Sequence, residues 1–121
     1  MIAWQEGAWI ETNLIDARHE VVTGQGVFET VLVSDQVPQF LNLHLERLNN
    51  SCQILGLGPP ALPVIREGIE QLLDGRITDR GRLRVTVFGG LPELLLMISL
   101  VDVDPWPESA RVIISPWIRN E

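Results

Sequence analysis

Apolar side chains between residues 41 and 75 recur with the spacing of amphipathic helices. In the first stretch they stand at intervals of four and three residues, at Leu41, Leu45, Leu48, Cys52 and Leu55. This spacing forms one continuous helical stripe, which we expect to face the core. Asn42 is suited to cap the first turn, because its side chain can accept a hydrogen bond from an unpaired backbone amide. Gly56 is suited to end the helix, and the Gly58-Pro-Pro60 run prevents its continuation.

A second helix is predicted to begin near Pro63 and to end by Gly75, since proline fits the first turn of a helix and glycine its end. Its apolar side consists of Ile65, Ile69, Leu72 and Leu73. Two adjacent amphipathic helices need a sheet, or each other, to cover their apolar sides.

Alternating side chains predict the strands of such a sheet. One face of the strand expected at residues 27–33 carries Val27, Glu29, Val31 and Val33, and the other carries Phe28, Thr30 and Leu32. Turn-forming residues 34–36 then lead into residues 37–41, which completes a hairpin. Because an unpaired buried charge is costly, Glu29 is expected either at the sheet margin or held by a partner.

Residues 81–88 alternate in the same way. One face carries Leu83, Val85 and Val87, and the other carries Arg82, Arg84, Thr86 and Phe88. The first face is predicted to be core. The second is either a solvated surface or a site where guanidinium groups bind a carboxylate, and the pattern favours neither.

The remaining segments complete the prediction. Residues 2–12 suggest a hairpin that turns at Glu6-Gly7, residues 94–101 a central strand that is apolar on both faces, and residues 111–115 a further strand. Residues 14–22 are expected to form a short strand or loop, and residues 102–109 a connector. The expected fold is an α/β domain of the α+β kind, with a mostly antiparallel sheet and two helices packed on one face.

Composition narrows the possible functions. The chain has 121 residues, enough for one domain, and a formal net charge of −7 with a pI near 4.7, which opposes nucleic-acid binding. Its nine positive residues are all arginine. The chain therefore has no lysine side chain that can form a Schiff base. Two histidines and one cysteine are too few for a closed zinc site, and His19 is more simply a solvated loop residue.

The same composition suggests a compartment. Cys52 lies on the apolar stripe and is expected to be a core residue in a reducing environment. The N-terminal residues lack the basic and apolar regions of a signal peptide, and the longest apolar run, residues 94–101, is far shorter than the ~20 residues of a membrane span. We therefore expect a cytoplasmic protein without a membrane partner.

His44 and Arg47 are candidate anion ligands. They are three residues apart and so neighbour each other near the start of the first helix, where the helix dipole favours an anion. The alternative is a solvated arginine that pairs with Glu46 or another acidic neighbour.

Three segments together resemble the class IV, or fold-type IV, pyridoxal-phosphate enzymes, which include branched-chain aminotransferases, D-amino-acid aminotransferases and aminodeoxychorismate lyases. They are Gly24-Gln-Gly-Val-Phe-Glu-Thr30, His44-Leu-Glu-Arg-Leu48 and Arg82-Leu-Arg-Val-Thr-Val-Phe-Gly-Gly90. The resemblance implies that residues 1–121 are the smaller, N-terminal domain of a two-domain homodimeric enzyme acting on amino acids or aminodeoxychorismate.

The resemblance also assigns roles to individual residues. Arg47 would bind the phosphate of pyridoxal 5'-phosphate, Arg84 would lie near the substrate, and Phe28 would form a wall of the substrate pocket. The family's Schiff-base lysine would belong to a C-terminal domain absent from this chain, so no catalytic residue is assigned here and the chain alone is expected to be inactive. Transamination and elimination stay open.

Two alternatives stand beside this hypothesis. One is a free-standing, non-catalytic domain that binds an anionic metabolite or a protein partner. The other is a purely structural domain whose arginines are all solvated, in which case replacing Arg47 or Arg84 by alanine would change no ligand affinity.

Overall fold

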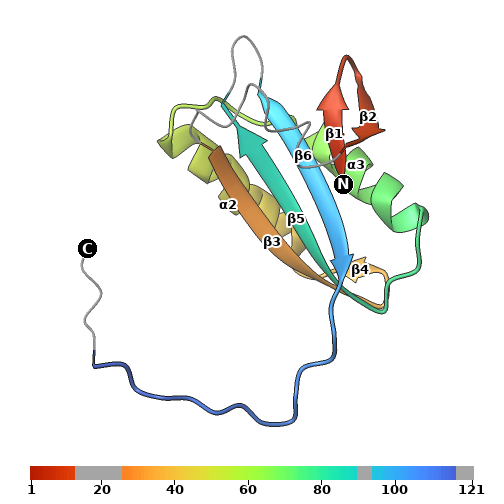
Figure 1. The fold of residues 1–121 in the computed structure, drawn as a ribbon. Helices are drawn as coiled ribbons and strands as arrows, with labels where there is room; N and C mark the ends of the chain where they lie inside the picture. The colour runs from red at the N-terminus through yellow and green to blue at the C-terminus, as the bar shows by residue number, and fades with distance from the viewer. Residues whose placement is uncertain (13–25, 90–93, 117–121) are drawn as a thin grey trace.

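The protein folds around one antiparallel sheet, seen in a computed structural model that describes residues 1–12, 26–89 and 94–116 (Figure 1). Within these residues the sheet has six strands, β1 (Ile2–Gln5), β2 (Ala8–Glu11), β3 (Gly26–Ser34), β4 (Val37–Pro38), β5 (Arg80–Phe88) and β6 (Leu95–Asp102). They lie in the order β2-β1-β6-β5-β3-β4, and each neighbouring pair is antiparallel.

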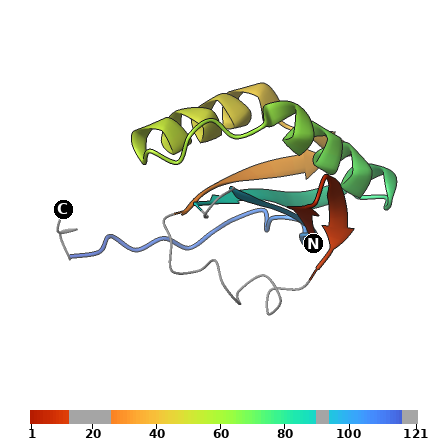
Figure 2. The same ribbon diagram turned by 90° about the horizontal axis from the view of Figure 1, so that it is seen from above.

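Two helices, α2 (Leu41–Ile54) and α3 (Leu62–Asp74), lie side by side on one face of this sheet (Figure 2). The other face carries no helix in the described part of the chain. The prediction of a mostly antiparallel sheet with two helices on one face is therefore confirmed.

The three long strands at the centre carry most of the sheet. β3 and β5 pair from Gly26 opposite Phe88 to Ser34 opposite Arg80, and β5 pairs with β6 over its length. β6 lies between β5 and β1, which confirms the central strand predicted from its two apolar faces. The predicted hairpin at residues 2–12 is also present, and the one predicted at residues 27–41 has a return strand of only Val37–Pro38, because α2 begins at Leu41.

The core lies between the sheet and the helices. Its fully buried members include Val31, Val33, Leu45, Leu48, Ile65, Leu83, Val85, Val87 and Ile98. Both predicted helical stripes supply it, with Cys52 buried on α2 and Ile69 on α3, but Leu55, predicted on the first stripe, follows the helix and is 40% exposed. Trp9 closes one side by donating from Nε1 to the carbonyl of Val64 at 2.9 Å.

The N-cap prediction for the first helix is wrong. Phe40 occupies the N-cap position with φ 54° and no side-chain cap bond, so the helix begins at Leu41. Asn42 then lies inside the first turn, and its Oδ1 accepts a hydrogen bond from Arg66 Nη2 on α3 at 2.6 Å. The end of the helix agrees better with the prediction, because Gly56 follows Leu55 with φ 68°.

The strand predicted at residues 111–115 is also wrong. These residues form no regular structure, and Val112, Ile113 and Ile114 are 89%, 92% and 99% exposed. In Figure 1 the segment runs away from the sheet, and it is not one of the hydrogen-bonded strands of that sheet. Of the connector predicted at residues 102–109, Asp102 belongs to β6 and residues 103–109 form no helix or strand.

Several predictions fall on residues 13–25 and 90–93, outside the described part of the chain. They concern the strand or loop at residues 14–22, His19, and the glycine-containing segment at residues 24–25. Neither of the two described helices is long and apolar enough to cross a membrane.

Candidate functional site

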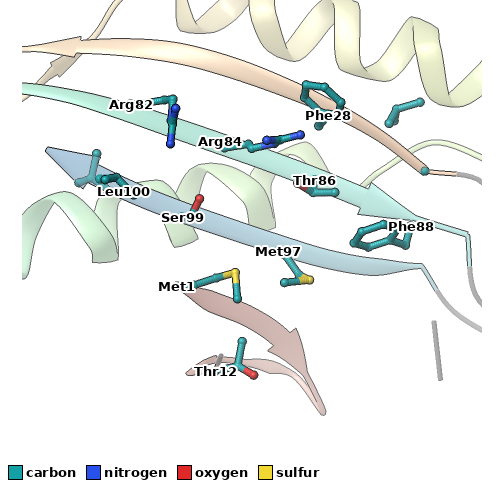
Figure 3. Close-up of a pocket in the computed structure, with 13 residues that line it drawn as sticks. Met1, Thr12, Phe28, Arg82, Arg84, Thr86, Phe88, Met97, Ser99 and Leu100 are labelled. Atoms are coloured by element: carbon teal, nitrogen blue, oxygen red, sulfur yellow. The ribbon is translucent and has the colours of Figure 1, made fainter. Parts of the chain in front are cut away.

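A pocket of about 710 Å³ opens on the sheet face that the helices leave uncovered (Figure 3). Its floor is formed by outward-facing side chains of β3, β5 and β6, and Met1 and Thr12 line it from the β1–β2 hairpin. Pleating explains this composition, because every second residue of each central strand points away from the core. The face that carries Arg82, Arg84, Thr86 and Phe88 is therefore a pocket wall and not only a solvated surface.

Two residues predicted for the substrate site meet in this pocket. The guanidinium carbon of Arg84 lies 3.9 Å from the centroid of the Phe28 ring, within the range of a cation–π contact (Figure 3). Phe28 is 56% exposed, so the ring is open to a ligand as well as to Arg84. The ring holds one face of the guanidinium and leaves its N–H edge available.

Other pocket residues were not predicted from the sequence as part of a site. Ser99 and Met97 come from β6, where the apolar run suggested only core, and Ser99 lies opposite Arg84 in the strand register. The hydroxyl of Ser99 in an otherwise apolar strand was the available signal. Met1 and Thr12 carry no such signal, because only the β1–β6 pairing brings the hairpin to the pocket.

The third predicted residue, Arg47, lies on the other side of the sheet. It contacts Glu29, which points from β3 toward α2 and is only 5% exposed. Arg47 Nε donates to Glu29 Oε1 and Arg47 Nη2 donates to Glu29 Oε2, both at 2.7 Å. Of the two possibilities predicted for Glu29, the one with partners is correct, and the acidic neighbour of Arg47 is Glu29 and not Glu46.

His44 completes this cluster. Its Nδ1 lies 2.8 Å from Glu29 Oε2, and since a carboxylate only accepts, Nδ1 is the donor. The predicted proximity of His44 and Arg47 on α2 therefore has a physical role, because one carboxylate on β3 engages both. We call Glu29, His44 and Arg47 the Glu29 cluster.

The charges of the Glu29 cluster stabilise one another. Burial raises the pKa of Glu29, but hydrogen bonds and charge attraction from Arg47 and His44 outweigh burial, so the pKa of that carboxyl lies below its usual value. The hydrogen bonds to Glu29, and its charge, raise the pKa of Arg47 in turn. The carboxylate is therefore ionised and the guanidinium charged at neutral pH.

The structure thus brings Phe28 and Arg84 together and separates both from Arg47. The first two face the pocket, whereas Arg47 lies on the helix-covered side with its side chain 69% exposed. No group of three or more potential metal-binding side chains occurs among the described residues.

Comparison with known proteins decides the family. Residues 26–121 match the family model described as amino-transferase class IV, which covers most of the chain and all three central strands. The chain belongs to the class IV aminotransferase family. Members of this family depend on pyridoxal 5'-phosphate, and the family includes aminodeoxychorismate lyases.

A relative of known sequence supports this family assignment. The class IV domain is 37% identical over 95 residues to the bifunctional aminodeoxychorismate lyase / D-amino acid transaminase of Mycobacterium tuberculosis (strain ATCC 25618 / H37Rv). That match covers 76% of this chain and 32% of the relative, so the chain spans about a third of the length of the curated relative it matches.

Solved structures of similar fold cover a comparable share of this chain. A protein provisionally assigned as a 4-amino-4-deoxychorismate lyase superposes with a TM-score of 0.61 at 26% identity, over 81% of this chain and 37% of that one. The PLP-bound form of a hypothetical aminotransferase from Mycobacterium tuberculosis gives a TM-score of 0.57 at 25% identity, over 81% and 39%.

Proposed function

We propose that this chain is the N-terminal small domain of a two-domain pyridoxal-phosphate enzyme, an aminotransferase or an aminodeoxychorismate lyase. The observation that carries the proposal is Arg47, an exposed guanidinium already oriented by a buried carboxylate at the position where the family motif has its phosphate ligand. The family match and the one-third share of the relative's length support the domain assignment.

The residues present fit a phosphate group. Arginine has five N–H donors, of which Arg47 uses two for Glu29, and its side chain is open to solvent. Three N–H groups therefore remain for phosphate oxygens, which suit the planar guanidinium. The chain has no lysine, so covalent attachment of the cofactor would come from another part of the enzyme.

When bound, pyridoxal phosphate supplies an electron sink for a carbanion at the substrate Cα. The role of this domain is to bind and orient. Arg47 would hold the phosphate, Arg84 would pair with a carboxylate of the amino substrate, and Phe28 would form an apolar wall and keep Arg84 in place.

The positions of Arg47 and of the Phe28–Arg84 pocket, on opposite faces of the sheet, support a homodimer. Within one copy the sheet separates Arg47 from the Phe28–Arg84 pocket. Both groups could act on a bound cofactor and substrate if the pocket of one copy faced the site of its partner, as expected for a family whose members function as dimers.

The phosphate assignment is tested by titrating the 121-residue chain with pyridoxal phosphate and, separately, with pyridoxal, which lacks the phosphate. Tryptophan fluorescence reports binding. We expect tighter binding of pyridoxal phosphate, an advantage that Arg47→Gln removes and that Arg66→Gln, an exposed arginine on α3, preserves. Equal affinities of the wild-type chain for both compounds would refute the assignment.

The domain assignment is tested by the intact mass of the native gene product purified from its source. We expect a mass well above the 13.6 kDa of this chain, together with absorbance of a bound cofactor that borohydride removes. A mass of 13.6 kDa would favour the second candidate, a free-standing anion-binding domain. The absence of lysine beside two accessible arginine sites is the observation that favours this alternative.

A further inference from the structure

Glu29 is a buried acid in a row of valines. It lies on the helix-facing side of β3 with Val27, Val31 and Val33, and the last two are completely buried. A valine would continue this row, whereas a carboxylate must be removed from water and compensated by partners. The fold alone therefore gives no reason for an acid at this position.

The geometry of the pair indicates what the acid does. Arg47 meets Glu29 through Nε and Nη2, the side edge of the guanidinium. Two parallel bonds fix the plane of the group, and the end edge formed by Nη1 and Nη2 still has one N–H on each nitrogen. The exposed fraction of Arg47, 69%, leaves that end edge accessible.

His44 restrains the acid in turn. It stands one turn before Arg47 on α2, and its Nδ1 binds Glu29 Oε2, the oxygen that also accepts from Arg47 Nη2. Three donors from one helix therefore prevent the carboxylate from rotating. Because His44 is largely covered and Arg47 is not, the inner contacts are shielded from water while the outer edge is exposed.

We propose that Glu29 and His44 are positioning residues, which fix the plane of Arg47 so that its outer edge receives a phosphate monoester in two parallel hydrogen bonds. The inference rests on the proposed phosphate-binding function of Arg47 and adds the two residues on which its orientation depends. Neither residue touches the anion. A preset guanidinium binds with less loss of side-chain freedom than a mobile one.

Charge and positioning make opposite predictions for Glu29. Its negative charge lies beside the anion site and repels an anion, so on Coulomb interactions alone a neutral replacement would strengthen phosphate binding. If Glu29 acts by orientation, the same replacement weakens binding although it makes the site more positive. The sign of the change therefore separates a positioning residue from one that only satisfies a buried charge.

The experiment is a titration of the ¹⁵N-labelled 121-residue chain with inorganic phosphate at constant ionic strength, followed at the Arg47 Nε–H signal. We expect Glu29→Gln to weaken phosphate binding about tenfold, the loss of roughly one charge-assisted hydrogen bond. Glu46→Gln removes an exposed acid from the same helix without touching Arg47 and is expected to bind as the wild type does. Relaxation of the Nε–H signal without phosphate is expected to report a rigid group in the wild type and a mobile one in Glu29→Gln.

A second pair of variants serves if Glu29→Gln fails to fold. His44→Ala is expected to weaken phosphate binding, and His44→Asn, which retains a donor for Glu29, to restore it. Unchanged or tighter binding by Glu29→Gln or by His44→Ala, with wild-type binding intact, would overturn this inference and leave the proposed function standing. A wild-type Arg47 signal that phosphate does not move would refute the proposed function itself, and the inference with it.

Discussion

The two faces of β3 carry an arginine contact each, and the two contacts differ in kind. On the helix-covered face, Arg47 is bound in two hydrogen bonds to a buried carboxylate. On the open face, Arg84 rests on the ring of Phe28 and lines a pocket. Glu29 and Phe28 are consecutive residues, so one strand supplies both supports.

One sheet can therefore hold one arginine rigidly and another adaptably. Two directional bonds to an ionised carboxylate fix the plane of a guanidinium. An aromatic face attracts the cation but allows it to slide and rotate, at an energy of about 0.5–1 kcal/mol where exposed. We therefore expect the arginine contact on the helix-covered face to be rigid and the one on the open face to be adaptable.

The largest change in the free energy of unfolding is expected when two leucines on opposite faces of the sheet are compared. Leu83 of β5 is 0% exposed beneath the helices, and Leu32 of β3 is 41% exposed on the open face. We expect Leu83→Ala to lower the free energy of unfolding by about 2–5 kcal/mol and Leu32→Ala by less than about 1 kcal/mol. Urea denaturation followed by tryptophan fluorescence measures both. Equal losses would mean that the open face is covered in solution.

Gly68 tests how closely the helix layer approaches the sheet. A Cβ at this position would lie 2.5 Å from Trp9 Cε2 and 2.8 Å from Ile98 Cδ1, both in the core. Alanine favours a helix over glycine by about 1 kcal/mol, but the overlap costs more, so Gly68→Ala should destabilise by about 1–2 kcal/mol.

The control for this prediction is Glu70→Ala, an exposed position on the same helix, where we expect a change within about 0.5 kcal/mol. Thermal denaturation provides the comparison. A Gly68→Ala chain more stable than the wild type would show that α3 does not pack closely on Trp9.

The Glu29 cluster predicts a pH dependence of stability. Because the pKa of Glu29 is lower in the folded chain than in the unfolded chain, its contribution is present above the ordinary glutamate pKa of about 4.3 and is lost as the pH falls through the lower folded value. Glu29→Gln should therefore be less stable than the wild type at pH 7, by about 1 kcal/mol for charge-assisted bonds reduced by solvent screening.

The difference between the two chains should shrink as the pH falls below about 4.3. Denaturation curves at several pH values, with Glu46→Gln as the control, measure it. A constant difference at all pH values would mean that the charge of Glu29 is not what stabilises the pair.

The smallest effect is expected on the open face. Arg84→Gln removes the contact with the Phe28 ring and should destabilise by about 0.5 kcal/mol, with Arg82→Gln, which also lines the pocket, nearer to zero. Chemical denaturation and the ring-proton shifts of Phe28 report the change. A loss as large as that of Glu29→Gln would remove the distinction between a rigid and an adaptable arginine.

Much of the fold could be predicted from the sequence because its signals are local. The alternation at residues 27–33 and 81–88 and the helical stripe through Leu45 and Leu48 each follow from where a strand or helix points its side chains. The predictions at Asn42 and at residues 111–115 were wrong because a cap and a strand depend on other parts of the chain. A cap depends on how the chain enters the helix, here through Phe40 with a positive φ, and a strand depends on a partner.

The residue types of the candidate sites can be read from the sequence: an acid among valines, a histidine and an arginine three residues apart, alternating arginines on a strand, and no lysine anywhere. Which of these residues meet depends on the fold. Glu29 and Arg47 are 18 residues apart in the chain and join because α2 packs on β3, whereas Arg84 reaches Phe28 through the β3–β5 pairing. Side-chain direction is a local property of the backbone, but the partner of a charge depends on long-range packing, which no spacing along the chain specifies.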